Sequence, residues 1–333
     1  MQASATARVW NRGDWARLVR LFSMGATVAY SLLGMATAGG HASVGQALAA
    51  VLVGISFHLF AFPLNDVIDL PIDRTNPRRA DGPLVRGLIA PNTMLGVALA
   101  QVPLMAAVLL VADAGSGAFL SWILAVVTLG AYDLWGKRLP VPFVADIIQG
   151  AGFAALVVMG GYWRGGPGVV TWWVAAYIVV YIAQINAVHG GVRDIGNDTA
   201  HGARTTPVLL GCAVDADGVP LISRSMIAFS FFTEVAQIAA LVGIAFTVPR
   251  SGEPWWALPG AALAVRMFAV RLGWQAFAMR RNRSRMMSLG VWHLFWALTA
   301  VVVAPLGGSP LWLMLLVIGV YLAPPGIFAR LTN

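Results

Sequence analysis

Long apolar stretches alternate with short polar segments along almost the whole chain. A helix needs about 20 apolar residues to cross the hydrocarbon core of a bilayer. The pattern predicts such spans at residues 17–38, 45–64, 93–112, 117–135, 141–161, 168–189, 225–248, 254–276, 287–305 and 309–328. Glycine and proline inside them are compatible with membrane helices, because neighbouring helices satisfy the freed backbone groups. We therefore expect an all-α polytopic membrane protein with nine or ten transmembrane helices.

The amino-acid composition narrows the class of protein further. Of the 333 residues, 59% are hydrophobic and 11% are charged, against about 25% charged in a typical soluble domain. This excludes an ordinary soluble enzyme and a disordered chain, and the single cysteine excludes an internal disulfide. The net charge is +8, but nearly all basic residues lie between apolar runs, where they set membrane orientation. We expect a lipid bilayer as partner and no nucleic acid.

The basic residues also predict the orientation. With the N-terminus inside, 20 of the 22 Lys and Arg residues fall on the cytoplasmic side, and only Arg164 and Arg250 fall outside. We expect a multi-pass protein of the cell (inner) membrane, with a cytoplasmic N-terminal arm at 1–16 and one transmembrane domain at 17–328. Two Asp-rich loops, 65–92 and 190–211, are then both cytoplasmic.

Five aspartates are concentrated in these two loops. Asp66, Asp69 and Asp73 are spaced i, i+3 and i+7, and Asp194 and Asp198 are spaced i and i+4. On helices, each set shares one face. Four spans separate the two loops, as in a weak parallel repeat, so both sets reach the same side of the membrane.

Gathered carboxylates repel one another, and a divalent cation offsets the repulsion. Mg²⁺ takes one or two carboxylates and completes its shell with water and phosphate oxygens. Two facing clusters could therefore hold a diphosphate through Mg²⁺, with nearby Arg and Lys on the remaining oxygens. Either cluster alone also fits a plain solvated surface, whereas two clusters on one face favour a site.

These motifs resemble those of the UbiA superfamily of intramembrane prenyltransferases. Residues 65–73 match its N-D-x-x-D-x-x-x-D motif, and the match continues to residue 89. Asp194 and Asp198 match its second motif, D-x-x-x-D, with a family-like tail at 202–211. Tyr132 and Lys137 resemble the family's Tyr/Lys element. The resemblance covers about residues 15–305.

The resemblance implies a ring of nine helices around a lipid-open cavity, with any tenth helix as a C-terminal addition. It implies Mg²⁺ as cofactor and an isoprenyl diphosphate as substrate. The residues expected to hold Mg²⁺ and to act in catalysis are Asp66, Asp69, Asp73, Asp194 and Asp198. Those expected to bind diphosphate are Asn65, Lys137, Arg138, Arg193, Arg78, Arg204 and Tyr132.

Polar residues inside predicted spans are functional hypotheses by default. Glu234 and Asp146 lie within spans, and Asn186 and His189 lie near the end of the span that carries the second motif. We expect these four to contribute to an acceptor pocket. A structural hydrogen bond between helices is the alternative role for each of them.

The expected reaction is transfer of an isoprenyl group from its diphosphate to a small aromatic acceptor. A terpene cyclase of the same superfamily, in which the allylic cation is captured by its own chain, would use the same diphosphate residues. A membrane transporter is a weaker alternative, because transporters tend to place their sites near the bilayer midplane. Gly82 stands where many quinone-pathway members carry Arg, so the motifs do not assign a pathway.

Overall fold

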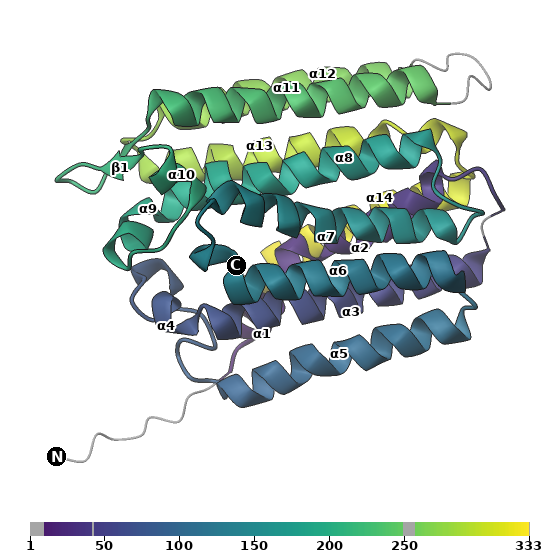
Figure 1. Cartoon of the computed structure of the whole chain (residues 1–333), viewed down its shortest axis with the longest axis horizontal. Coiled ribbons are helices and arrows are strands. Elements are labelled where there is room, and N and C mark those ends of the chain that lie inside the picture. The colour runs from purple at the N-terminus through teal and green to yellow at the C-terminus, as the bar shows by residue number, and fades with distance from the viewer. Residues whose placement is uncertain (1–9, 42, 249–256, 333) are drawn as a thin grey trace.

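The computed structural model describes residues 10–41, 43–248 and 257–332. Long helices lie nearly side by side in one bundle (Figure 1). They are α2 (Leu21–Thr37), α3 (Val44–Ile68), α5 (Pro91–Val111), α6 (Gly115–Trp135), α7 (Pro142–Tyr162), α8 (Val169–Ala183), α11 (Arg224–Thr247), α12 (Ala257–Ala278), α13 (Arg283–Val303) and α14 (Leu311–Thr332). Each coincides with a predicted span, although 254–256 lie outside the described residues. The predicted all-α class is confirmed.

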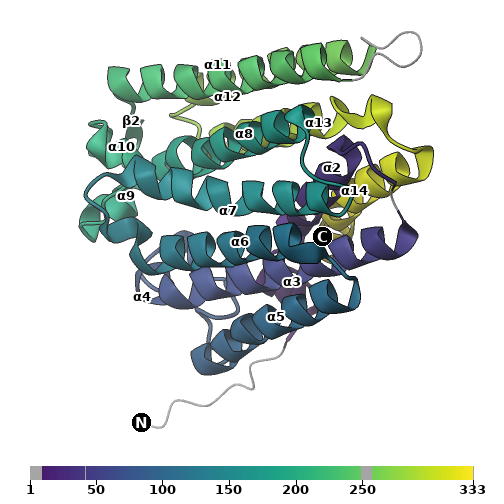
Figure 2. The same cartoon turned by 45° about the vertical axis from the view of Figure 1, so that its right-hand side comes forward.

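Short elements connect the long helices. They are α1 (Arg12–Leu18), α4 (Leu70–Asp73), η1 (Pro77–Arg79), η2 (Gly136–Arg138), η3 (Gln184–Gly190), α9 (Gly191–Ala200), α10 (Thr206–Leu209), β1 (Ala213–Val214), β2 (Pro220–Leu221) and η4 (Leu306–Gly308). The strands form a small antiparallel hairpin. Elements α4, α9 and α10 gather at one end of the bundle (Figures 1 and 2), so the fold brings the two Asp-rich segments to the same end.

Within the described residues, eight helices are long and apolar enough to cross a membrane, or nine if the bent pair α1 and α2 is one span. Helix α12 is not among them, although it packs along α11 and α13. It carries Arg266, which the charge count assigns to a cytoplasmic flank. That assignment is wrong, because Arg266 is fully buried and forms an ion pair with Glu234 of α11.

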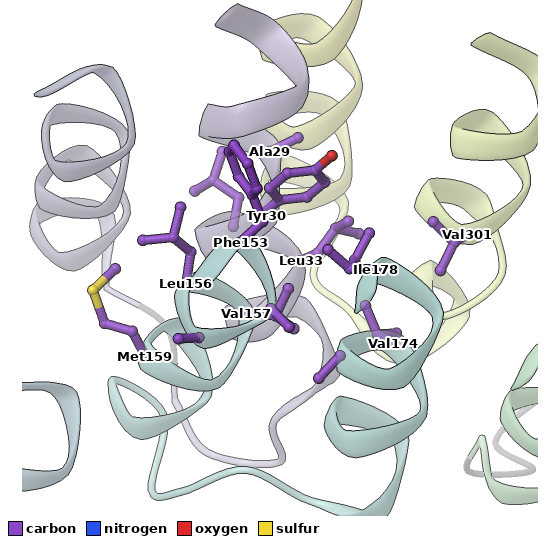
Figure 3. Close-up of a cluster of buried hydrophobic side chains, with 14 of the residues drawn as sticks. Ala29, Tyr30, Leu33, Phe153, Leu156, Val157, Met159, Val174, Ile178 and Val301 are labelled. Carbon is purple, nitrogen blue, oxygen red and sulfur yellow. The ribbon is translucent and has the colours of Figure 1, made fainter. Parts of the chain in front are cut away.

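The centre of the bundle is an apolar cluster between α2, α7 and α8 (Figure 3). Tyr30 of α2 meets Phe153 of α7 edge to face, with ring centroids 5.8 Å apart. Ile178 of α8 is fully buried beside them. Outward-facing side chains are also apolar, including Leu104, Leu120 and Phe232, as a lipid environment requires.

Helices α2 and α7 approach each other closely because each helix has a glycine that faces the backbone of the other. A Cβ atom on Gly34 would lie 1.8 Å from the carbonyl oxygen of Val157, and one on Gly160 would lie 1.9 Å from that of Ser31. Small residues at such crossings are typical of membrane helices, whose association depends on close packing. The α2–α7 contact therefore tolerates no side chain at either position.

We expect Gly160→Val to destabilise the protein by at least about 1–3 kcal/mol, because the new side chain forces two backbones apart. Thermal unfolding in detergent measures the effect. Gly319→Val in α14 is the control, since nothing lies within 4 Å of a Cβ built there. Equal melting temperatures for the two variants would contradict this view of the crossing.

Candidate active site

A cavity of about 710 Å³ opens at the end of the bundle where the Asp-rich segments gather. All five motif aspartates line it: Asp66, Asp69, Asp73, Asp194 and Asp198. Its walls come from α2, α3, α6 and α7, and its rim from the segments around α4 and α9. The two motifs, which are more than 100 residues apart in the sequence, thus face one shared space.

The first motif lies at the end of α3. Asp66 occupies the last turn, and Asp69 is the C-cap residue. Pro71 then lies in the first turn of α4, where a proline has no N–H to lose from the helix. Asp73 ends α4, so the chain turns while all three carboxylates stay on the cavity side.

The second motif lies beyond a π-helical segment. Helix α8 continues into η3, which is π-helical, and then into α9, which carries Asp194 and Asp198 one turn apart. Gly191 lies at this junction, and a Cβ there would be 2.6 Å from Cγ of Pro207. The absence of a side chain at Gly191 therefore lets the α10 segment pack directly on the motif-bearing helix.

Arg78 joins the two motifs. Its Nη1 donates to the carbonyl oxygen of Arg193 at 2.6 Å and to Oδ1 of Asp194 at 3.3 Å. Thr75 Oγ1 adds a longer contact to Asn197 Oδ1, at 3.4 Å. The loop that follows the first motif is therefore held directly against the second motif.

Three other arginines also pair with motif carboxylates. Arg193 Nε donates to Asp194 Oδ2 at 3.0 Å, and Arg79 Nε lies 3.6 Å from Asp73 Oδ1. Arg20 forms an ion pair with Asp66, and its guanidinium lies 5.1 Å from the ring centroid of Phe62. The mouth of the cavity thus alternates carboxylates with guanidinium groups, which suits binding of both a divalent cation and an anion.

Sequence reasoning did not single out Arg20. It lies outside both motifs, between α1 and α2, in a left-handed conformation with φ of 43°. Helix α1 is held by fully buried Asp14, whose Oδ1 accepts from Nη1 of Arg86 at 2.6 Å. No local sequence pattern links Arg20 to Asp66, because the pairing depends on how α1 packs over the loop after the first motif.

The donor set fits Mg²⁺. Within the described part of the chain, no three His, Cys, Asp or Glu groups form a preassembled metal cage. Mg²⁺ does not need one, because it keeps several waters and binds through one or two carboxylates and substrate phosphates. Hard carboxylate oxygens from two sides of one cavity are what such a shared ion requires.

The other residues expected at the site fall into two groups. Those that line the cavity are Asn65, Tyr132, Arg78, Arg193, Arg204, Asp146 and Asn186. Arg138, His189 and Glu234 are not among the lining residues found in the described part of the chain. The side chain of Lys137 lies outside the described residues.

The wall formed by α6 and α7 carries further polar groups. Asp133 of α6 accepts from Asn65 Nδ2 at 3.1 Å, and Asn65 Nδ2 also lies 3.3 Å from Asp69 Oδ2. Asp146 of α7 accepts from Thr206 Oγ1 at 2.6 Å, and Gln149 accepts from Asn186. Asp133 and Gln149 were not singled out from the sequence, although their positions inside predicted spans are the same signal that pointed to Asp146.

Below the polar groups the cavity becomes apolar. Phe62 of α3 and Phe153 of α7 both line it, with ring centroids 6.3 Å apart. Leu129 and Ile185 continue this surface. A hydrophobic chain can therefore lie against this surface while a charged group stays at the mouth.

Glu234 lies in a separate network whose acidic and basic groups are buried. Its carboxylate pairs with Arg266 of α12 and His293 of α13, the latter at 3.1 Å. It also accepts from Gln184 Nε2 of η3 at 2.7 Å. His189 joins the network through His293, at 2.7 Å. These contacts tie three helices to the π-helical segment that precedes the second motif.

We expect Glu234→Ala to lower the free energy of unfolding by about 3–5 kcal/mol, because it leaves the Arg266 guanidinium buried without its counter-charge. Thermal unfolding in detergent provides the measurement. Gln101→Ala, at a partly exposed position of α5 whose side chain donates to a carbonyl of its own helix, should leave the melting temperature nearly unchanged. A Glu234→Ala protein as stable as wild type would show that the network does not hold these helices together.

The chain matches the model of the UbiA prenyltransferase family over residues 27–289. No curated protein matches the chain closely.

Solved structures share the fold at low sequence identity. A UbiA homolog from Aeropyrum pernix K1 superposes with a TM-score of 0.60 at 20% identity, covering 85% of this chain and 96% of that one. A UbiA homolog from Archaeoglobus fulgidus, bound to GPP and Mg²⁺, gives 0.61 at 15% identity, with 86% and 99% covered. A digeranylgeranylglyceryl phosphate synthase gives 0.59 at 15%, with 88% and 98% covered.

Proposed function

Because the chain belongs to the UbiA prenyltransferase family, we propose that it transfers an isoprenyl group from an isoprenyl diphosphate to a small aromatic acceptor, with Mg²⁺ as cofactor and release of diphosphate. The main support is the bridge from Arg78 to Asp194, which draws both aspartate motifs to one cavity. The GPP- and Mg²⁺-bound homolog from Archaeoglobus fulgidus supports the same ligand classes.

The proposed roles follow from the donor set. Asp66, Asp69 and Asp73 would hold Mg²⁺ from one side, and Asp194 and Asp198 from the other. Bound Mg²⁺ supplies positive charge for the diphosphate as the bond to the isoprenyl carbon breaks. Removing either motif should therefore remove most of the stabilisation of the leaving group.

The arginines at the mouth would bind the remaining diphosphate oxygens. Guanidinium groups match phosphate oxygens in pairs, and Arg20, Arg78 and Arg193 all face the cavity. Each already pairs with a motif aspartate, so diphosphate binding would redistribute existing contacts. We propose further diphosphate contacts from Asn65, Tyr132, Lys137 and Arg204, and none from Arg138, which is not among the described residues that line the cavity.

The apolar surface would accommodate the isoprenyl chain. Ionisation of an allylic diphosphate leaves a carbocation that water would quench. The rings of Phe62 and Phe153 exclude water and can stabilise a cation by about 0.5–2 kcal/mol each. The acceptor ring then forms the new carbon–carbon bond and loses a proton, which restores its aromaticity.

We further propose that residues 17–328 act as one transmembrane domain, with the N-terminal arm and both Asp-rich loops in the cytoplasm. The excess of basic residues at this end supports that orientation. A water-soluble diphosphate headgroup would then enter from the cytoplasm.

Cysteine labelling tests the orientation. In a Cys212→Ser background we expect Asp217→Cys, on the exposed turn after β1, to react with an impermeant maleimide only in inverted vesicles. Asp113→Cys, between α5 and α6 at the opposite end, should react in intact cells. The reverse result would place the aspartate motifs outside.

Incubation with Mg²⁺ and geranyl, farnesyl or geranylgeranyl diphosphate tests the reaction, with and without phenolic acceptors. We expect acceptor-dependent prenylated product and diphosphate release, both abolished by EDTA and restored by Mg²⁺. A cyclic hydrocarbon formed from the diphosphate alone would contradict transfer and establish cyclisation.

We expect Asp69→Ala and Asp194→Ala each to reduce Mg²⁺-dependent diphosphate release by at least about 100-fold, because each removes charge that holds the cation. Melting temperatures should stay close to wild type. Asp217→Ala, exposed on the hairpin at the same end, is the control and should remain active. Wild-type turnover in either motif variant would contradict the proposed Mg²⁺ site.

A further inference from the structure

We propose that the α6–α7 wall of the cavity is the acceptor subsite, and that it selects an uncharged, hydroxyl-bearing aromatic acceptor over one that carries a carboxylate. This inference rests on the proposed transfer reaction and adds the chemical class of the acceptor. It is carried by Asp133, Asp146 and the amide groups beside them.

Asp133 supplies the observation that points to a ligand. Its side chain lines the cavity, yet the residue is only 9% exposed. Oδ1 accepts from Asn65 Nδ2 at 3.1 Å, whereas Oδ2 is buried with no hydrogen-bond partner among the described residues. Buried polar atoms are almost always paired, so a hydroxyl group from a bound molecule would satisfy this oxygen.

Asp133 also lies next to the first aspartate motif. Asn65 Nδ2 contacts both Asp133 Oδ1 and Asp69 Oδ2, so one amide separates the unpaired oxygen from the first motif. An acceptor hydrogen-bonded to Asp133 would therefore lie beside the diphosphate end of the isoprenyl substrate. Leu129 of α6 and Phe153 of α7 offer an apolar surface for its ring.

Asp146 adds a second acidic side chain to this wall, on α7. It is 7% exposed and accepts from Thr206 Oγ1 at 2.6 Å. One turn further into the helix, Gln149 accepts from Asn186 of η3. This part of the wall thus offers a carboxylate, a hydroxyl and two amides.

Most of the positive charge on the lining is already paired. Of the six arginines that line the cavity in the described part of the chain, five form ion pairs with carboxylates. The sixth, Arg204, is exposed. A carboxylate on the acceptor would be buried beside Asp146 without a counter-charge among these residues, which is strongly unfavourable. A hydroxyl group incurs no such penalty.

A matched pair of acceptors tests the selection without any substitution. Methyl 4-hydroxybenzoate and 4-hydroxybenzoate differ in the charge of one group, and each would be supplied with Mg²⁺ and the isoprenyl diphosphate that the protein ionises. Prenylated product and diphosphate release would be measured separately. We expect kcat/KM to be at least about tenfold higher for the ester, since burying a carboxylate without a counter-charge is strongly disfavoured.

Two isosteric variants then locate the selection. Asp133→Asn keeps an oxygen for Asn65 but presents an N–H donor to the ligand, and Asp146→Asn removes the charge while still accepting from Thr206. We expect Asp146→Asn to lower the ester-to-acid ratio by about tenfold, because it removes the negative charge beside the acceptor carboxylate. Asp133→Asn should lower kcat/KM for both acceptors, because both carry the hydroxyl group that Asp133 would bind. Asp113→Asn, at the opposite end of the bundle, is the matched control and should leave the ratio unchanged.

The outcomes separate this inference from the proposed function. Equal or better use of 4-hydroxybenzoate by the wild type would overturn the inference while leaving prenyl transfer intact. So would an unchanged ratio in Asp146→Asn, or unchanged kcat/KM for both acceptors in Asp133→Asn. A raised Mg²⁺ requirement in Asp133→Asn would also overturn it, because Asp133 would then be a metal ligand. If no isoprenyl diphosphate is ionised, the proposed function itself fails and the inference falls with it.

Discussion

Carboxylates gathered at one end of an apolar helix bundle repel one another, and any stable arrangement of this fold has to place positive charge among them. The arginines do this in a specific way. Arg78 reaches from the loop after the first motif to Asp194 of the second, and Arg20 reaches Asp66 from before the first long helix. The shape of the cavity depends on these contacts, because they hold together segments that are distant in the sequence.

A second charged cluster is organised on a different principle. Glu234 and Arg266 are buried between helices and neutralise each other, and buried His293 lies beside Glu234. The network meets the cavity at the π-helical segment η3, which contributes Gln184 and His189 to the network and Asn186 to the cavity lining. Similar residue types therefore line the cavity and hold the helices together. The two groups differ in whether the side chain faces the cavity.

Much of the fold and the two aspartate motifs could be predicted from the sequence, because both follow from local patterns. Runs of about 20 apolar residues specify membrane helices, and the two motifs have spacings that place carboxylates on one helical face. The expected membership of the UbiA superfamily is confirmed by the match over residues 27–289. The site roles of individual residues stay predictions.

What could not be predicted depends on which faces of distant helices meet. In the sequence, Arg266 resembles a basic residue of a cytoplasmic flank. The packing of α12 against α11 reveals its partner, Glu234. Arg20 and Asp133 belong to no motif, so their place at the cavity follows from tertiary contacts alone. Single polar residues at helix ends are ambiguous in a sequence for this reason.

The most direct measurement is a structure of the protein with Mn²⁺ in place of Mg²⁺ and a farnesyl thiodiphosphate that resists ionisation, with the metal located by anomalous scattering. Our account expects the metal between the diphosphate oxygens and carboxylates of both motifs, with the farnesyl chain against Phe62 and Phe153. A diphosphate bound away from the cavity, or metal held by one motif alone, would contradict it.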